Sequence, residues 1–315
     1  MALGRPPLSS LTCKLFLSLA NLLLYLAIMP VQPRLMPEIT ISSINCNSLN
    51  MSSTGSQTHK LKIYGVTSLR SDIITLSDTR LVSNQGTSGL SILTSSLLVN
   101  PYGAYTPYFN SSQNKRGVGI LLRKSCDFSV EQVERDAAEN ILVLRLKKKG
   151  SNLQFIVGAI YGPNGYDPRF FEEIRRCLAA MGDHPVILAG DWNCSYSCAN
   201  RDANIDILNM HNPPNLRHSK LLKNLCDDLL LADPYRCKYP NRLEYTYIPS
   251  AINKRNRSRL DFFVVSQSIL EEIKHCTIKP TTQNKLFDHK AVTIDLRRKD
   301  KIISVPTVAR FILIS

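Results

Sequence analysis

Short apolar runs, separated by turn-forming or polar residues, constrain this chain more than any other feature. They have the length and composition of β-strands, and the run at residues 141–146 alternates as a half-buried strand should. We predict strands at residues 39–46, 73–76, 118–122, 141–146, 155–161, 186–189, 262–265 and 291–296. The runs 155–161 and 186–189 are apolar throughout, so we expect them to be central strands.

Two segments carry a clear helical pattern. Asp167 and Pro168 predict a helix start, with the aspartate as N-cap and the proline as first helical residue, and an apolar face continues to Met181. A second helix is predicted from about Ser219 to Leu230. Because strands outnumber helices without regular alternation, we predict a four-layer α/β sandwich, in which two packed β-sheets are flanked by helices.

The ends of the chain differ from its middle. We predict one folded domain at residues 38–300, a leader at 1–37 and a tail at 301–315. The leader holds an uncharged run, Leu15 to Met29, which is typical of a signal-peptide core or membrane anchor, although a leader without either role is the plain alternative. We expect a nuclear or cytoplasmic protein, and membrane anchoring through this run is the alternative.

Charge and cysteine content narrow the classes of function. The 39 Lys and Arg against 25 Asp and Glu give a net charge of +14, which indicates a polyanionic partner such as nucleic acid or an anionic membrane. The plain alternative is that the charge serves solubility.

The nine cysteines are scattered and form no Cys-x-x-Cys pair, so we expect neither a disulfide framework nor a zinc site.

Polar strings end several of the apolar runs, at residues 44–47, 160–164, 190–193 and 287–289. Each string alone is more often a turn or a cap. Together they supply carboxylates, amides, a phenol and an imidazole. These are the groups needed to hold a divalent metal on a phosphate and to direct a water at phosphorus.

The string at 190–193 carries the strongest chemistry. Asp191 and Asn193 are two residues apart after an apolar run, so in extended backbone they share a face. A carboxylate and an amide on one face can orient a water and bind phosphoryl oxygens. Gly190 before them allows another group to approach the backbone closely.

Other polar positions complete the expected site. Asn47 and Asp78 each end a strand-like run, and Asp288 precedes the last one; all three offer the oxygen atoms that Mg²⁺ prefers. His289 follows Asp288 directly, so the two side chains point apart in extended backbone, one toward a metal and the other toward a phosphate. The imidazole needs a carboxylate to fix its tautomer, and Asp261 opens a predicted strand that can supply it.

The order Asn-x-Asn, carboxylate-Thr, Tyr-x-Pro-Asn, Gly-Asp-x-Asn, Leu-Asp and Asp-His resembles the endonuclease/exonuclease/phosphatase superfamily, which includes DNase I and exonuclease III. The chain is most similar to the apurinic-like endonuclease domain of LINE-type (non-LTR) retrotransposons, with further matching strings at 39–49, 116–121, 244–247 and 259–261. The resemblance covers roughly residues 38–297. It implies a DNase I-like fold and a magnesium-dependent DNA endonuclease that nicks one strand and leaves a 3′-hydroxyl.

The resemblance also implies roles for the matching residues. The expected catalytic set consists of Asp191, Asn193, His289, Tyr161, Asp261 and Asn45. The expected ligands of Mg²⁺, or of Mn²⁺ as an alternative, are Asp78, Asn47 and Asp288. The expected contacts to DNA are Thr246, Lys254, Arg255, Arg257 and Arg259.

In this assignment, Asp191 orients or deprotonates the attacking water and Asn193 stabilises the transition state. Tyr161 contacts the scissile phosphate. His289, oriented by Asp261, binds or protonates at that phosphate.

Three residues depart from the pattern of the family. Asp78 stands in place of a glutamate, Ser48 in place of a glycine and Phe287 in place of a serine. Aspartate is one methylene shorter, so its oxygens reach the ion less well unless the backbone shifts or a water intervenes. Two alternatives therefore stay open: a phosphatase of the same superfamily acting on inositol phosphates or lipids, and a catalytically decayed DNA-binding remnant. In each nucleic-acid case we expect a monomer with DNA, and no obligate protein, as its partner.

Overall fold

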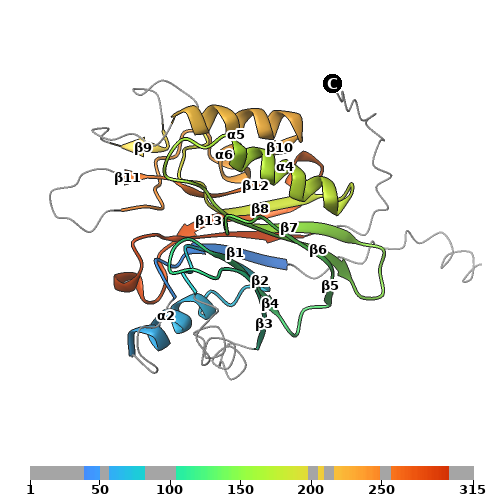
Figure 1. Ribbon diagram of the computed structural model, residues 1–315, viewed down its shortest axis with the longest axis horizontal. Helices are drawn as coiled ribbons and strands as arrows, with labels where there is room; N and C mark the ends of the chain where they lie inside the picture. Colours follow the sequence, from blue (N-terminus) through green and yellow to red (C-terminus); the bar gives the residue numbers. More distant parts are fainter. Residues whose placement is uncertain are drawn as a thin grey trace, which may run out of the picture. The chain divides into compact units, whose positions relative to one another are not determined.

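The architecture consists of two packed β-sheets with helices on their outer faces (Figure 1). The computed structural model describes residues 39–49, 57–81, 104–197, 205–208, 216–248 and 257–297. The predicted four-layer α/β sandwich is confirmed within these ranges. No helix among them is both long and apolar enough to cross a membrane. The predicted leader and tail lie outside the described residues.

The first sheet has the strand order β13-β14-β1-β2-β4-β3. Its strands are β1 (Ile39–Asn45), β2 (Ile73–Ser77), β3 (Tyr105–Asn110), β4 (Val118–Arg123), β13 (Ile273–Lys279) and β14 (Ala291–Leu296). β1 and β2 are parallel, with Asn45 opposite Ser77, and the other neighbours are antiparallel. The carboxyl ends of β1 and β2 therefore lie at one edge of the sheet, where their polar strings begin.

The second sheet has the order β10-β12-β8-β7-β6-β5. Its strands are β5 (Phe128–Arg135), β6 (Ile141–Lys148), β7 (Gln154–Tyr161), β8 (Val186–Asp191), β10 (Leu231–Ala232) and β12 (Asp261–Ser266). The expected central position of β7 and β8 is confirmed, and the two strands are parallel. A small separate ribbon pairs β9 (Ile207–Leu208) with β11 (Arg257–Ser258).

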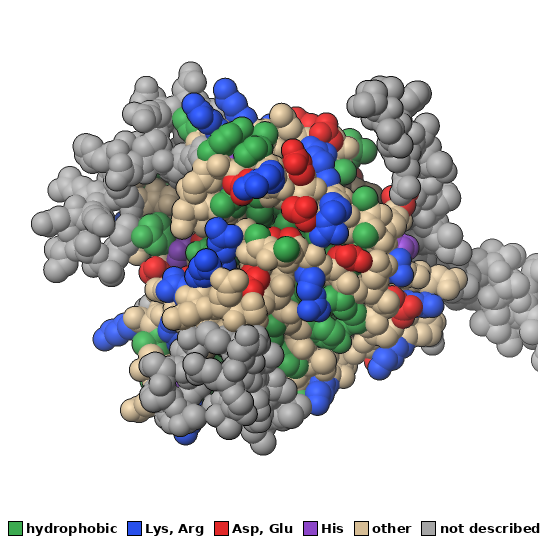
Figure 2. Space-filling view, in the orientation of Figure 1, with side chains coloured by type: hydrophobic (Ala, Val, Ile, Leu, Met, Phe, Trp, Pro, Cys, Tyr) green, Lys and Arg blue, Asp and Glu red, His purple; other side chains and the backbone are tan. Residues whose placement is uncertain are grey.

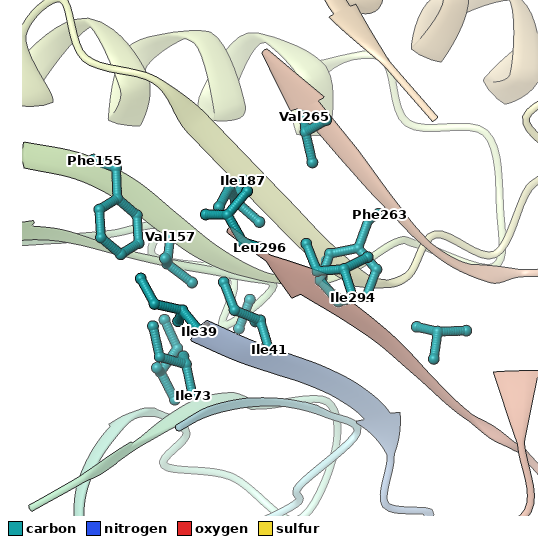
Figure 3. Close-up of a cluster of buried hydrophobic side chains, with 14 of the residues drawn as sticks. Ile39, Ile41, Ile73, Phe155, Val157, Ile187, Phe263, Val265, Ile294 and Leu296 are labelled. Atoms are coloured by element: carbon teal, nitrogen blue, oxygen red, sulfur yellow. The ribbon is translucent and has the colours of Figure 1, made fainter. Parts of the chain in front are cut away.

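Strand alternation divides the apolar side chains between layers. Ile39 of β1 lies in the core between the two sheets, whereas Ile44 packs in the layer on the other side. Figure 3 shows the inter-sheet core, where Val157, Ile187 and Phe263 of the second sheet meet residues of the first. Each fully buried side chain of this size contributes about 1.5–3 kcal/mol, so this core holds the two sheets in one alignment.

The helices cover the outer faces of the sheets (Figure 1). They are α2 (Gln57–Thr67), which lies against the first sheet, and α4 (Arg169–Met181) and α5 (Leu216–Asp228), which lie against the second, followed by the short α6 (Pro234–Lys238), η2 (Gln267–Glu272) and η3 (Asn284–Leu286). The predicted start of α4 is wrong by one residue, because Pro168 occupies the cap position and Asp167 Oδ1 accepts a hydrogen bond from Arg169 N at 3.2 Å. The second predicted helix ends earlier than expected, since Leu230 adopts a left-handed φ of 51°.

Candidate active site

The registers of neighbouring strands bring polar side chains into one row. Tyr161 at the end of β7 lies opposite Asp191 at the end of β8, and Asp191 lies opposite Asp261 at the start of β12. From the facing sheet, Asn45 Nδ2 donates a hydrogen bond of 2.8 Å to Asp191 Oδ2. The two sheets therefore meet through side chains of the predicted catalytic set.

A pocket of about 330 Å³ opens at this edge, and we call it the site pocket. Of the nine residues predicted for catalysis or metal binding, all but Asp261 line it: Asn45, Asn47, Asp78, Tyr161, Asp191, Asn193, Asp288 and His289. Asp261 lies behind His289, to which it is hydrogen-bonded. The structure thus brings together positions that are more than 200 residues apart in sequence, from Asn47 to Asp288.

Asp191 is a buried carboxylate held at both oxygens. Oδ2 accepts from Asn45 Nδ2 at 2.8 Å, and Oδ1 accepts from the backbone N–H of Asn193 at 2.9 Å. Burial, together with the neighbouring Asp261 carboxylate, raises the pKa of Asp191 to about 6, although His289 and the two hydrogen bonds act in the opposite direction. Such a carboxylate is ionised at neutral pH and is still basic enough to take a proton from water.

His289 is a buried imidazole between two carboxylates. Its Nδ1 lies 2.6 Å from Asp261 Oδ2, and its Nε2 lies 4.0 Å from Asp191 Oδ2. Burial alone lowers the pKa of His289, but Asp261, Asp191 and Asp288 outweigh burial and raise it to about 9. At neutral pH the ring is therefore a cation, held in one orientation by Asp261 and by the Tyr247 ring, whose centroid is 4.9 Å away.

The Thr246 side chain supports Asp261 from behind. Its Oγ1 accepts hydrogen bonds from the backbone N–H groups of Leu260 and Asp261, both at 3.1 Å. The prediction that Thr246 contacts DNA is wrong for its side chain, which is fully buried. Thr246 instead fixes the backbone that carries the partner of His289.

Arg259 was also predicted to contact DNA, and this prediction is wrong. Its side chain is 0% exposed. The Nε lies 2.6 Å from Asp206 Oδ1, and Nη1 lies 2.6 Å from Asp233 Oδ2. The guanidinium is therefore paired inside the protein with two carboxylates from elsewhere in the chain. Because Arg259 lies two residues before Asp261, these pairs anchor the start of β12.

The other predicted DNA contacts fall in or next to the segment 249–256. Arg257 is exposed on β11, opposite Leu208 of β9. Lys254 and Arg255 lie outside the described residues, so their role stays a prediction. On the face shown in Figure 2, Lys and Arg side chains are interspersed with Asp and Glu. The charge excess alone therefore does not locate a nucleic-acid surface on that face.

The predicted metal ligands Asp78, Asn47 and Asp288 share the site pocket. Asp288 Oδ1 is buried and has no hydrogen-bond partner among the described residues, which is expected of an oxygen available to a cation. Both oxygens of Asp78 accept from Arg80, Oδ1 from Nε at 2.9 Å and Oδ2 from Nη2 at 2.6 Å. The donor set fits a hard divalent cation, but one of its carboxylates already has a cationic partner.

Asp191, Asp261 and His289 form a second group that could hold a metal, since each offers a ligand atom within 4.8 Å of the others. Two of these atoms, His289 Nδ1 and Asp261 Oδ2, are already joined by a short hydrogen bond. Asp78, Asn47 and Asp288 therefore stay the predicted metal ligands, and the role of the buried group stays a prediction.

The turn after β1 explains one departure from the family pattern. Asn47 and Ser48 have φ angles of 43° and 71°, in the left-handed region that favours glycine. Lys62 of α2 stabilises this turn, because its Nζ donates to the carbonyls of Cys46, Asn47 and Ser48 at 3.0, 2.5 and 2.9 Å. The serine is therefore accommodated in a conformation that a glycine adopts at lower cost.

The close approach expected at Gly190 is confirmed. A Cβ at this position would collide with the backbone carbonyl of Ile160, and a Cβ at Gly162 would collide with that of Trp192. Both glycines lie where β7 and β8 run side by side into the site. They allow Tyr161 and Asp191 to sit on adjacent strand ends.

Four residues that the sequence did not single out as site residues also line the pocket: Arg80, Asn164, Tyr247 and Leu260. Asn164 belongs to the Tyr-Gly-Pro-Asn string, so that motif could have identified it. Arg80 is a cation two residues after an expected metal ligand, which is a weaker signal. Tyr247 enters through a β-bridge to His289, which only the fold reveals.

Comparison with solved structures finds proteins of similar fold. AP endonuclease LMAP from Leishmania major has a similar fold, with a TM-score of 0.65, 15% identity, and coverage of 83% of this chain and 88% of that protein. An AP endonuclease from Archaeoglobus fulgidus has a TM-score of 0.58 and 16% identity, with coverage of 84% of this chain and 100% of that protein. The 3′-5′ exonuclease NExo from Neisseria meningitidis has a TM-score of 0.60 and 18% identity, with coverage of 82% of this chain and 99% of that protein. These likenesses show a shared fold, which is the fold that the resemblance implies.

Sequence comparison also finds similarity to a protein of a mobile element. The chain is similar to the transposon TX1 uncharacterized 149 kDa protein of Xenopus laevis, with 26% identity over 159 residues. The match covers 49% of this chain and 11% of that much longer protein. The chain matches no protein-family profile.

Proposed function

We propose that the chain is a divalent-metal-dependent DNA endonuclease of the retrotransposon type, which hydrolyses one phosphodiester and leaves a nick. The observation that carries this proposal is the placement of an anionic Asp191 and a cationic His289, with Nε2 and Oδ2 4.0 Å apart, in one pocket with Tyr161 and the metal-ligand oxygens. A base and a phosphate-binding cation in such proximity suit attack of water on phosphorus.

Asp191 accepts a proton from the attacking water, whose oxygen bonds to phosphorus as the P–O3′ bond breaks. The 3′-oxygen leaves with a proton from solvent and becomes the hydroxyl of the nick. His289 and Tyr161 bind the phosphoryl oxygens on which negative charge accumulates. Asn193, whose Nδ2 is anchored on the Gly162 carbonyl at 2.7 Å, orients Asp191 and faces the same pocket.

A divalent cation held by Asp78, Asn47 and Asp288 would neutralise charge on the phosphate and the leaving oxygen. The fold supports nuclease or phosphatase chemistry, because AP endonucleases and the exonuclease NExo share it. The relation to a transposon protein and the net charge of +14 favour DNA as the substrate.

The test is a comparison of substrates with one preparation of the full chain. Supercoiled plasmid and phosphoinositide vesicles are incubated with a series of Mg²⁺ concentrations, and nicked circles and released phosphate are measured. We expect nicking that requires the divalent ion, without phosphate release from the lipid. Phosphate release without nicking would instead establish the phosphatase alternative, and salt-dependent DNA binding without nicking would establish the decayed remnant.

A further inference from the structure

A second pocket adjoins the site pocket and shares four residues with it: Asp78, Arg80, Tyr161 and Asn164. Its volume is about 530 Å³, and we call it the basic pocket after the three cations that line it, Arg80, Lys115 and Arg116. Lys115 and Arg116 are exposed. Arg80 lies between the two pockets and is the only one of these three cations that lines both.

The basic pocket also offers an amide without a complete set of partners. Asn140 lines it and is 5% exposed, and its Oδ1 has no hydrogen-bond partner among the described residues. Its backbone is fixed, because its N–H donates to Asp136 Oδ1 at 2.9 Å and its carbonyl accepts from Tyr161 N at 2.8 Å. This oxygen is a hydrogen-bond acceptor, so it suits a donor group of a ligand, and an anion in the same pocket would be bound by the three cations.

Arg80 pairs with Asp78 through both sides of its guanidinium, by the two bonds of 2.9 and 2.6 Å from Nε and Nη2. The same planar fork binds a carboxylate or a phosphate in two-point geometry. The Arg80 side chain is 38% exposed, whereas that of Asp78 is 6% exposed. The guanidinium can therefore turn toward a ligand in the basic pocket without disturbing the core.

The backbone around Asp78 is fixed by hydrogen bonds. Its carbonyl accepts from Ser48 N at 2.9 Å, and the following Thr79 N–H donates to the Gly117 carbonyl at 3.0 Å. A carboxylate so little exposed is unfavourable without a cation beside it. If Arg80 leaves, the most favourable replacement is another cation at the same oxygens, and Asp288 Oδ1 in the same pocket supplies a further ligand.

We propose that Arg80 couples anion binding to metal binding. Without nucleic acid, its guanidinium occupies both oxygens of Asp78. When a nucleic-acid phosphate enters the basic pocket, Arg80 pairs with that phosphate and frees Asp78 for a divalent cation. The inference rests on the proposed function in taking a DNA phosphate as the natural anion. By thermodynamic linkage, the anion strengthens metal binding by the same factor by which the metal strengthens anion binding.

The chain offers a matched control for the Arg80 side chain. Arg169 also follows an aspartate at a distance of two residues, and its Nε lies 3.2 Å from Asp167 Oδ1. Asp167 lines the basic pocket too. Arg80→Gln and Arg169→Gln therefore each remove one arginine charge that pairs with an aspartate of the basic pocket. The Arg169 pair is a single, exposed contact, and only Arg80→Gln frees an expected metal ligand.

The experiment measures Mn²⁺ binding by the loss of the free-ion electron paramagnetic resonance signal, so no catalysis is needed. Wild type and both variants are titrated in potassium chloride and in potassium sulfate at equal ionic strength, and then with a phosphorothioate-linked duplex. We expect sulfate or duplex to tighten Mn²⁺ binding to wild type by about fivefold or more. Arg80→Gln should bind Mn²⁺ by a similar factor more tightly without any anion, and anions should add nothing.

Arg169→Gln should behave as wild type, and Asp78→Asn in the Arg80→Gln background should lose the gain. Tightening by duplex without tightening by sulfate also supports the proposal and identifies the polynucleotide as the required anion. Equal gains in Arg80→Gln and Arg169→Gln would overturn it, since the effect would then be general electrostatics. An absence of any anion effect on wild type would overturn it too. Coupling without plasmid nicking would keep this inference and end the proposed function.

Discussion

Replacing Asp261 with asparagine is expected to lower the pKa of His289 and to change how stability depends on pH. The side chain keeps its shape and can still accept from Nδ1, but the charge 2.6 Å from the ring is lost. The pKa of His289 is raised from 6.5 to about 9, and Asp261 is the carboxylate that contributes most to the rise. At about 1.4 kcal/mol per pH unit, the favourable interactions of the charged ring amount to about 3 kcal/mol.

The sign of the effect follows from the direction of the pKa. Because His289 binds its proton more tightly in the folded state, its contribution to stability is complete below pH 6.5 and is lost as pH rises through about 9. The Asp261→Asn protein should therefore be less stable than wild type by up to about 3 kcal/mol below pH 6.5. The two stability curves should converge above pH 9.

The assay is urea unfolding at a series of pH values, combined with NMR titration of the His289 ring. Asp288→Asn is the matched control, because Asp288 makes a smaller contribution to the same pKa and has no hydrogen bond to the ring. Its effect should be smaller and should have the same sign. Parallel stability curves for wild type and Asp261→Asn, or an unchanged His289 pKa in that variant, would refute the reasoning.

Three further predictions follow from the site. Nicking should rise with pH through about 6, as Asp191 ionises, and fall above about 9, as His289 loses its proton; a flat rate across this range would contradict the assigned pair. Arg259→Met should cost about 3–5 kcal/mol in urea unfolding, because it leaves the buried Asp233 carboxylate without its cation while Asp206 keeps Arg236, and it should leave the salt dependence of DNA binding unchanged. Replacing Lys254, Arg255 and Arg257 together with alanine should instead make the salt dependence less steep, by the equivalent of about three phosphate contacts at most. An unchanged slope of the binding curves would contradict a role of this loop in DNA binding.

The elements that the sequence reveals are those buried on both faces. The apolar runs of β7 and β8 identify central strands because every side chain in them meets a core. Within the two six-stranded sheets, the strands that pattern analysis missed are the edge strands β3, β5, β10 and β13; the two-residue strands β9 and β11 of the separate ribbon were missed as well. β5 reads Phe-Ser-Val-Glu-Gln-Val-Glu-Arg and β3 contains Pro107, and both features are tolerated at an edge but weaken a sequence signal.

The candidate site was predictable where a motif carries its own chemistry. Asp191 and Asn193 could be found because they lie at the end of a strand-like run, and His289 because it precedes one; strand ends converge at a sheet edge. Arg259 could not be placed correctly, because its partners Asp206 and Asp233 are distant in sequence and only the fold brings them to the guanidinium. A basic residue in a basic stretch resembles a DNA contact until its buried partners are known.

The ion pair between Arg80 and Asp78 likewise could not be predicted from the sequence motif. The shorter side chain of Asp78 led to the expectation of a ligand with reduced reach. The structure shows that both of its oxygens are engaged by a neighbouring cation. The local sequence contains both residues, but their pairing depends on left-handed φ angles of 53° and 50° that no simple pattern predicts.

Nuclease activity at this site can be measured by nicking of supercoiled plasmid with wild type and with His289→Ala, followed by extension of the nicks with a DNA polymerase and labelled nucleotide. We expect open circles only in the presence of a divalent cation, with ends that the polymerase extends because they carry a 3′-hydroxyl. The rate should be lower by about two to four orders of magnitude for His289→Ala, with the fold intact. Nicking by His289→Ala at the wild-type rate, or nicking by wild type in excess chelator, would contradict this expectation.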